Sequence, residues 1–255
     1  MTSDKLKTAL VTGGAARIGA AIVRDLARHD FAIAIHTNSS TDAAELLASE
    51  IRARGGRACV VSGDLTNADD CGIMVQAAVD GIGPLGLLVN NASVFQDDSI
   101  TDFSSESFDR HLAVHVKAPL ILTSDFARQL PAGKQGLVVN MIDQRVWKLT
   151  PRFYSYTLSK AALWAATQTA AQALAPRIRV NAIGPGPTLK GSRQTEEDFA
   201  SQVDGLILKA GPALDEFGRT IRFLFDTSSI TGQMIALDGG QHLAWQTPDV
   251  AEIIE

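Results

Sequence analysis

The sequence predicts an α/β fold, with a doubly wound, seven-stranded parallel sheet that carries helices on both faces. Short apolar segments without strict polar alternation recur along the 255 residues, which is typical of strands buried on both faces. Longer amphipathic stretches separate them, and this order indicates parallel strands joined by crossover helices. No linker or low-complexity tract interrupts the pattern, so we expect one domain over residues 1–255.

Each expected strand is a short, mostly apolar run, and each expected helix places its apolar residues on one face. The expected strands are Thr8–Val11, Phe31–Ile35, Ala58–Ser62, Gly86–Val89, Leu137–Met141, Ile178–Ala182 and Met234–Leu237. The expected helices are Arg17–His29, Thr41–Arg54, Asn67–Asp80, Ser105–Gln129, Arg152–Ala175 and Leu214–Asp226. Ligands bind beyond the carboxyl ends of such strands, so we expect site-forming loops at Gln144–Thr150 and Pro185–Gln194.

Composition excludes several classes of function. Hydrophobic residues make up 45% of the chain, which suffices for a full core and argues against disorder. The formal net charge is −5 and no long basic run occurs, so we expect no nucleic-acid partner. We see no signal peptide and no membrane-spanning segment, and expect a cytoplasmic protein. Cys59 and Cys71 show no metal-binding spacing, which predicts reduced thiols and no metal site.

A glycine-containing loop follows the first strand and opens the first helix. It reads Thr12-Gly13-Gly14-Ala15-Ala16-Arg17-Ile18-Gly19. Glycines at this place let the backbone approach a pyrophosphate at a helix N-terminus. A tight turn with no ligand is the alternative.

The end of the second strand favours NADP(H) over NAD(H). A carboxylate here would bind the ribose 2′-hydroxyl of NAD and repel a 2′-phosphate, but none occurs before Asp42. Arg17 is expected nearby and favours phosphate. The alternative is that Ser39, Ser40 or Thr41 caps the next helix. The candidate phosphate donors are His36, Asn38, Ser39 and Ser40.

Tyr156 and Lys160 form the strongest catalytic signal. Residues four apart share a helix face, so the ammonium should lie beside the phenol. A nearby cation favours the phenolate and lowers the phenol pKa toward the working range. The pair can therefore exchange a proton with a carbonyl or an imine. Asp143 lies thirteen residues before Tyr156 and can exchange a proton with it.

These motifs resemble the short-chain dehydrogenase/reductase family over nearly the whole chain, from the glycine loop to Leu237-Asp238-Gly239-Gly240. Two departures are Arg17 at the middle glycine of the loop and His115 at the place of a helix asparagine. The resemblance implies a Rossmann fold, bound NADPH or NADP+, and assembly into dimers or tetramers. The cofactor contacts that it implies are Gly13, Arg17, Ile18, Gly19, Asp64, Leu65, Asn91, Ala92, Ser93, Tyr156, Lys160, Pro185, Gly186 and Thr188.

Some of these residues have simpler alternatives. Asp64 is expected at the adenine, or else caps the helix that starts near Asn67. His115 is expected to take part in a relay to Lys160, or else packs on a helix face. Small residues in the expected helix Arg152–Ala175 would allow close helix approach between subunits, or else pack against the chain's own sheet. Those small residues are Ala161, Ala162, Ala165, Ala166, Ala170 and Ala171.

Asp143 narrows the substrate class. Most family members have a serine there, whose hydroxyl bonds a substrate carbonyl. A carboxylate is a poor partner for a ketone oxygen but accepts N–H groups of a heterocycle. With Arg17, Ser93 and Phe95, the site resembles the pteridine reductases and the bacterial dihydromonapterin (alternative dihydrofolate) reductases. That resemblance implies stacking of Phe95 on a pterin, with Ser93 and Arg17 at its polar edge.

We therefore expect an NADPH-dependent reductase of a pterin or folate-like C=N bond, with Tyr156 as the proton donor. Asp143 is otherwise a capping carboxylate, and Phe95 otherwise a core residue. Cations after Asp143, Arg145 and Lys148 among them, are expected to attract an anionic substrate tail. The alternatives are a carbonyl reductase of the same fold, with Thr150 as the nearest replacement hydroxyl, and a non-catalytic NADP(H)-binding protein.

Overall fold

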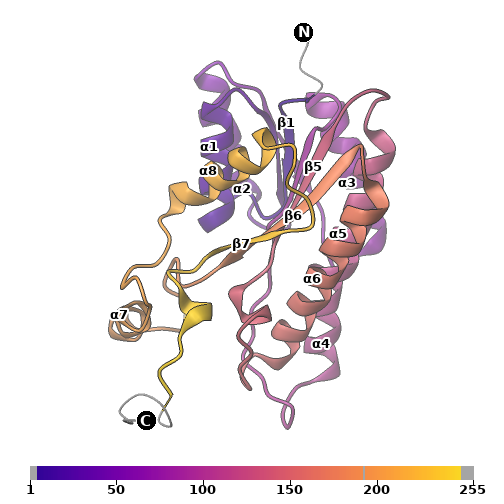
Figure 1. Ribbon diagram of the computed structural model, residues 1–255. Coiled ribbons are helices and arrows are strands. Elements are labelled where there is room, and N and C mark those ends of the chain that lie inside the picture. Colours follow the sequence, from indigo (N-terminus) through magenta and orange to yellow (C-terminus); the bar gives the residue numbers. More distant parts are fainter. Residues whose placement is uncertain (1–4, 192, 248–255) are drawn as a thin grey trace.

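The fold is built on one parallel sheet with the strand order β3-β2-β1-β4-β5-β6-β7 (Figure 1). The computed structural model describes residues 5–191 and 193–247. The doubly wound α/β fold with seven parallel strands is thereby confirmed. The strands are β1 (Thr8–Val11), β2 (Ala32–Thr37), β3 (Ala58–Ser62), β4 (Leu87–Asn90), β5 (Gly136–Met141), β6 (Ile178–Pro185) and β7 (Met234–Leu237).

The strand order reverses at β1, which pairs with β2 on one side and β4 on the other. Val11, the last residue of β1, is in register with Ile35 and with Val89. Because all the strands are parallel, their carboxyl ends meet at one edge of the sheet. A crevice forms at that edge beside the strand where the order reverses.

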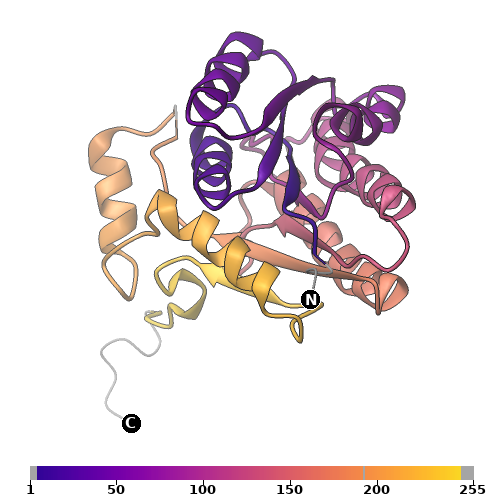
Figure 2. The same ribbon diagram turned by 90° about the horizontal axis from the view of Figure 1, so that it is seen from above.

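Helices cover both faces of the sheet. One face carries α1 (Arg17–Arg28), α2 (Thr41–Ala53) and α8 (Leu214–Asp226), whose buried residues share a core cluster. Figure 2 shows α1 and α8 lying side by side on this face. The other face carries α3 (Ala68–Ile82), α5 (Ala118–Gln129) and α6 (Tyr154–Leu174) over a second cluster. Phe217 in the first cluster and Phe126 in the second are fully buried.

The prediction of one long helix over Ser105–Gln129 was wrong in one respect. The segment divides into α4 (Ser105–Leu112), a π-helical turn (Ala113–Lys117) and α5. Pro119 lies in the first turn of α5 and has no N–H to give to a carbonyl one turn earlier. A π turn absorbs such a break without ending the helix, and π turns are frequent at functional sites.

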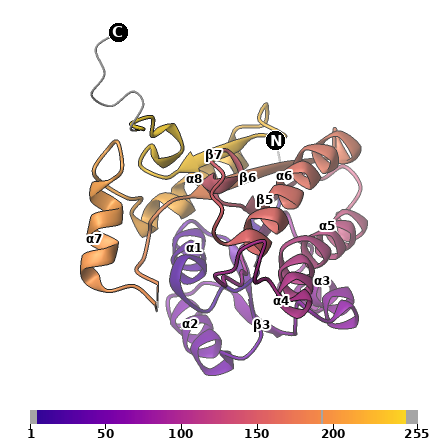
Figure 3. The same cartoon turned by 90° about the horizontal axis from the view of Figure 1, so that it is seen from below.

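Structure beyond the expected pattern lies at the carboxyl edge of the sheet. β6 continues three residues past the expected end at Ala182. Short 3₁₀ turns occupy Gln144–Val146 and Gln241–Leu243. An unexpected helix, α7 (Glu196–Asp204), begins with a Thr195–Asp198 capping box and buries none of its residues. Seen from below, α7 lies across this edge from α4 and α5 (Figure 3).

Candidate active site

Asp143 and Tyr156 meet at the carboxyl edge of the sheet. Asp143 follows β5 and is the N-cap of the first 3₁₀ turn, whereas Tyr156 lies in the first turn of α6. The Tyr156 hydroxyl donates to Oδ2 of Asp143 at 3.0 Å, and both residues are buried. Asp98, from a distant loop, accepts from the Ser155 N–H and holds the start of α6 in place.

Arg145 turns inward to Asp143. Its backbone N–H donates to Oδ1 at 2.8 Å and its Nη1 donates to Oδ2 at 3.2 Å. We had expected a surface cation that attracts a substrate tail, but the side chain is only 18% exposed and its charge faces the carboxylate. Arg145 follows Asp143 by only two residues. This short spacing between a carboxylate and a cation is the one feature of the sequence that could have indicated the contact.

Lys160 points toward the sheet below Tyr156. Its Nζ donates to the carbonyl oxygen of Met141 at 2.8 Å and lies 5.6 Å from the centre of the Tyr156 ring. Burial lowers the pKa of Lys160 to about 8, although Asp143 acts in the opposite direction. The ammonium is therefore held by a backbone carbonyl at the end of β5.

The expected lowering of the tyrosine pKa was wrong for the isolated protein. Burial raises the pKa of Tyr156 well above its usual value, and the carboxylate of Asp143 raises it further. Arg145 and the Ser93 hydroxyl act in the opposite direction without reversing the shift. Tyr156 is thus a protonated donor at neutral pH.

The burial of Lys160 predicts a pH-dependent stability. An unfolded lysine titrates near 10.5 and the folded one near 8, so between these pH values the unfolded chain binds more protons. Stability should therefore rise with pH across this window, and below about pH 8 the burial penalty is fully present. We expect the unfolding free energy of the wild type, measured against Lys160→Met, to gain on the order of 3 kcal/mol from below pH 8 to pH 10.5. Denaturant titrations at several pH values measure this difference, and a flat difference would contradict the assignment.

His115 lies in the π turn and has protein partners on both ring nitrogens. Nε2 accepts from the Val94 N–H at 3.1 Å and lies 2.9 Å from Ser93 Oγ, while Nδ1 lies 2.8 Å from Ser159 Oγ. Ser159 gives its proton to the Tyr156 carbonyl, so Nδ1 must be the protonated nitrogen. Burial and the Lys160 charge hold the His115 pKa well below its usual value.

His115 is therefore a neutral ring that connects two segments of the site through hydrogen bonds. The direct partners of its nitrogens belong to the segment after β4 and to α6, and Lys160 is not among them. Its ring also packs edge-on against Tyr156, with 5.4 Å between centroids. The resemblance implies that the relay to Lys160 runs through water, and this relay stays a prediction.

Phe95 forms an aromatic floor beside Tyr156 and is not a core residue. It is 43% exposed, lies edge-on to Tyr156 at 4.7 Å and stacks on Phe153 at 4.4 Å. Phe153 has a φ of 57°, the left-handed region that an aromatic residue rarely adopts. This conformation places its ring under Phe95 immediately before α6, and nothing in the sequence pattern indicated it. Ser93, Phe95 and Asp143, three of the expected substrate contacts, thus gather around Tyr156.

The glycine loop packs tightly against the segment after β4. A Cβ added to Gly13 would lie 3.0 Å from Ala92 Cα, and one added to Gly19 would lie 2.1 Å from the Gly13 carbonyl oxygen. Asn91 Nδ2 donates to the carbonyl oxygens of Thr12 and Gly13 at 2.9 and 3.2 Å. The loop is thus a close-fitting backbone cradle. Ile18 packs partly buried against the core beneath it.

Arg17 ties the glycine loop to the segment after β6. Its guanidinium donates to the carbonyl oxygens of Leu189 and Lys190 at 3.3 Å. The sequence placed Arg17 at a phosphate or at the substrate. The side chain is exposed and binds the segment after β6, and its contact with a phosphate or a substrate stays a prediction.

His36 does not offer a donor toward a phosphate, which corrects that expectation. Nδ1 accepts from the Gly13 N–H at 3.1 Å, which leaves the proton on Nε2, 3.1 Å from the Gly63 carbonyl oxygen. The ring is buried and its pKa is lowered by burial. Asn38, Ser39 and Ser40 remain exposed at the end of β2, and Ser40 makes no side-chain cap to α2.

A cavity of about 610 Å³ opens beside the glycine loop. The Asp64 carboxylate accepts from the Thr66 N–H at 2.8 Å, which lowers the pKa of that carboxyl group. Asn67, not Asp64, caps α3. The expected residues that line the cavity are Gly13, His36, Asn38, Asp64, Leu65, Ala92 and Ser93. The sequence pattern did not indicate the part of α4 that also lines it, which contributes Glu106, Asp109 and Arg110.

The turn after β6 closes the other side of the crevice. Gly186 donates its N–H to the Leu237 carbonyl at 2.8 Å, and a Cβ there would lie 2.6 Å from Asp238 Cα. Pro185 is the last residue of β6. Thr188 donates its hydroxyl back to the Gly186 carbonyl at 3.0 Å. The same hydroxyl can still accept a hydrogen bond, so Thr188 stays a predicted cofactor contact.

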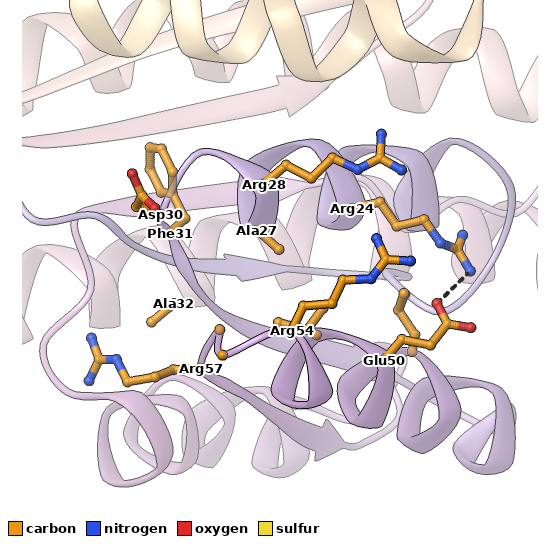
Figure 4. A pocket seen from close by; sticks show the side chains of 13 residues that line it. Arg24, Ala27, Arg28, Asp30, Phe31, Ala32, Glu50, Arg54 and Arg57 are labelled. Carbon is orange, nitrogen blue, oxygen red and sulfur yellow. Dashed lines mark hydrogen bonds and ion pairs between the residues drawn. The ribbon is translucent and has the colours of Figure 1, made fainter.

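A second cavity, of about 530 Å³, lies between α1 and α2 at the amino ends of β2 and β3 (Figure 4). Its rim includes Arg24, Arg28, Arg54 and Arg57, and Arg24 pairs with Glu50 at 3.5 Å. Cations at helix C-termini offset the partial negative charge of the last carbonyls. This cavity is at the opposite edge of the sheet from Tyr156 and takes no part in the site.

Residues 5–191 and 193–247 hold no group of three or more His, Cys, Asp or Glu side chains that could bind a metal ion. Over the same ranges, no helix is long and apolar enough to cross a membrane.

Known proteins resemble this chain over most of its length. The family model for short chain dehydrogenases matches residues 7–210. An uncharacterised oxidoreductase of Methylorubrum extorquens is 31% identical, covering 92% of this chain and 97% of its own. A 3-oxoacyl-[acyl-carrier-protein] reductase, FabG, of Staphylococcus epidermidis is 27% identical, covering 93% and 99%.

Two solved structures are more similar. FolM alternative dihydrofolate reductase 1 from Brucella canis, complexed with NADP, is 58% identical with a TM-score of 0.93, covering 99% of this chain and 100% of that one. The Brucella suis protein of the same name, also with NADP, is 60% identical with a TM-score of 0.94, covering 96% and 98%. The matched family model spans residues 7–210, well over half of the chain, so this chain belongs to the short chain dehydrogenase family.

Proposed function

We propose that this chain is an NADPH-dependent reductase that adds hydride to a C=N bond of a pterin or a dihydrofolate-type substrate. The observation that carries the proposal is the hydrogen bond from the Tyr156 hydroxyl to Asp143. The likeness to two alternative dihydrofolate reductases, at 58% and 60% identity, supports the same substrate class. Residues 1–255 would act as one reductase domain.

The residues present fit an NADP(H) molecule. There is no room for a side chain at Gly13 or Gly19, so the backbone of this loop can approach a pyrophosphate closely. Asn38, Ser39 and Ser40 are exposed polar groups beside it, and no carboxylate ends β2 to repel a 2′-phosphate. Asp64, Leu65, Asn91 and Ala92 would hold the adenosine half, and Pro185, Gly186 and Thr188 the nicotinamide half. The dinucleotide, when bound, supplies the hydride.

The chain's own residues supply the proton and hold the substrate. Tyr156 is protonated at neutral pH and buried, so it can donate to a ring nitrogen without competition from bulk water. Asp143 would orient the Tyr156 hydroxyl and accept a substrate N–H. Phe95 is 43% exposed beside Tyr156 and would stack on a flat heterocycle. Lys160 would hold the nicotinamide ribose and balance the charge of the phenolate.

Gly19→Ala is expected to weaken NADPH binding by about 10- to 100-fold, because the added methyl overlaps the Gly13 carbonyl oxygen and forces the cradle open. Gly72→Ala is the matched control, since a Cβ there meets nothing within 4 Å. Fluorescence titration with NADPH measures both affinities. Equal affinities for the two variants would remove the cradle from the cofactor site.

A carbonyl reductase remains the second candidate, favoured by the likeness to FabG. Such an enzyme needs a hydroxyl that donates to the ketone oxygen. Thr150 is exposed and gives its proton to the Arg152 carbonyl. The Ser93 hydroxyl lies 2.9 Å from Nε2 of His115, which already accepts the Val94 N–H, and it can donate to the Val94 carbonyl at 3.3 Å. Thr150 therefore offers no free donor, and a carbonyl reductase would depend on the Ser93 hydroxyl.

NADPH consumption with defined substrates decides between the two candidates. Four substrates are assayed separately at the same concentration: dihydrofolate, dihydrobiopterin, dihydromonapterin and a 3-ketoacyl thioester. We expect turnover of at least one pterin and little of the thioester. Turnover of the thioester alone would overturn the proposal in favour of the second candidate.

We also propose that the protein works in the cytoplasm as a homodimer or homotetramer assembled through α5 and α6. Leu158 is 41% exposed, and Ala162 and Ala165 are exposed one and two turns further along the same face of α6. Ala171, in contrast, is buried in the chain's own core. The free thiols of Cys59 and Cys71 are compatible with a reducing compartment. Sedimentation velocity tests the assembly.

A further inference from the structure

We propose that Arg145 is a positioning residue that orients the Asp143 carboxylate and offsets its negative charge beside the catalytic tyrosine. It would hold both oxygens of Asp143 in place and supply the second positive charge that the site needs when Tyr156 gives up its proton. This inference rests on the proposed function, because it concerns the proton donor of that reaction. No motif indicated it, since the sequence suggested only a surface cation.

The contacts of Arg145 determine the orientation of Asp143. The backbone N–H binds Oδ1 at 2.8 Å, and Nη1 binds Oδ2 at 3.2 Å. The same Oδ2 accepts the Tyr156 hydroxyl at 3.0 Å. A carboxylate held at both oxygens cannot rotate, so one lone pair of Oδ2 stays directed at the tyrosine. The Asp143 and Arg145 side chains are only 12% and 18% exposed, so water screens the contact weakly.

The charges of the site balance only when Arg145 is counted. After proton donation Tyr156 is a phenolate, and it then lies beside a second anion, Asp143, at hydrogen-bond distance. Lys160, below the ring, compensates one of these charges. Arg145 compensates the other, and its effect on the pKa of Tyr156 opposes that of Asp143. A serine in place of Asp143 would need no such partner.

The aromatic floor holds Arg145 in this position. Its guanidinium carbon lies 5.5 Å from the centre of the Phe95 ring and 5.0 Å from that of Phe153. Cations are attracted to the faces of aromatic rings, which here oppose outward motion of the side chain. Arg193 lies 5.6 Å from Phe95 and donates to its carbonyl, but it has no contact with Asp143. Arg145 is therefore the residue that links the floor to the carboxylate.

A double-mutant cycle tests this role. Arg145→Gln is made in the wild type and in Asp143→Asn, and single-turnover rates are measured so that slow variants remain measurable. We expect a loss on the order of tenfold or more in the wild-type background, and little further loss once Asp143 has no charge. The KM for NADPH should not change. Arg145→Lys should restore part of the rate, because it returns the charge without the planar fork.

Arg152→Gln is the matched control. Arg152 also lies over Phe153, at 5.2 Å, but pairs with Asp97 at the surface. It should leave the rate unchanged. Equal losses from Arg145→Gln in both backgrounds, or no loss in either, would overturn the proposal.

The cycle is run on whichever substrate the wild type reduces, a pterin or a 3-ketoacyl thioester. Absence of pterin turnover in the wild type would then count against the proposed function, whereas absence of coupling would count against Arg145. Unfolding free energies of the same four proteins need no turnover. They should show the same coupling, because Arg145→Gln leaves a buried carboxylate without its cation only when Asp143 is charged.

Discussion

Tyr156→Phe is expected to lower kcat for a dihydropterin by about 10²- to 10⁴-fold, the usual contribution of a positioned proton donor. The variant keeps the ring and therefore its edge-on contacts with Phe95 and His115. It removes only the hydroxyl that donates to Asp143. The loss should thus fall on the chemical step and leave the KM for NADPH and the thermal stability nearly unchanged.

Tyr154→Phe is the matched control for this experiment. Tyr154 lies in the same first turn of α6, and its ring is 6.1 Å from that of Phe103, away from Asp143. It should keep wild-type turnover. If Tyr156→Phe retained full kcat with any substrate, proton donation by Tyr156 would be excluded and a protein that only binds NADP(H) would gain support.

Asp143→Ser is expected to have the second-largest effect, and to change the substrate as well as the rate. The carboxylate that accepts a pterin N–H is lost, so turnover of the dihydropterin should fall about 100-fold or more. A serine hydroxyl can donate to a ketone oxygen, so turnover of the 3-ketoacyl thioester should rise from its low starting level. The ratio of kcat/KM for the two substrates, measured with NADPH, reports both changes.

Loss of the carboxylate also leaves the Arg145 side chain with no anion beside it, so Asp143→Ser should be compared with Asp143→Ser/Arg145→Gln. The double variant separates the effect of the unpaired cation from that of the missing acceptor. Asp143→Asn keeps the size of the side chain without its charge and should lose pterin turnover. Unchanged pterin turnover in Asp143→Ser would show that the carboxylate does not select the substrate.

The sequence was sufficient for the architecture because the strands follow local apolar patterning. The bounds of β1, β3, β7 and α8 agree with those expected, and the parallel order is confirmed. Two features depended on more than periodicity. Pro119 converts the middle of a continuous helical segment into a π turn, and α7 buries no residue, so it has no strong apolar face to predict it.

The candidate site was predictable where it depends on spacing along the chain. The register of Asp143 with Tyr156 anticipated a contact that the structure contains. The roles of His36 and His115 were not predictable, because their nitrogens bind groups distant in sequence. Phe153 takes a left-handed conformation that its residue type disfavours, and only tertiary packing explains it. Burial, also a tertiary property, reversed the expected shift in the pKa of Tyr156.

Transfer of deuterium from NADPH labelled at C4 of its nicotinamide tests the central claim most directly. The protein is incubated with each of the two C4-deuterated epimers of NADPH and with dihydrofolate, and the product is analysed by mass spectrometry and NMR. We predict that one epimer gives tetrahydrofolate with deuterium at the ring carbon of the reduced C=N bond, while the other gives unlabelled product. No labelled product from either epimer, together with label in the hydroxyacyl product of a 3-ketoacyl thioester, would contradict the account.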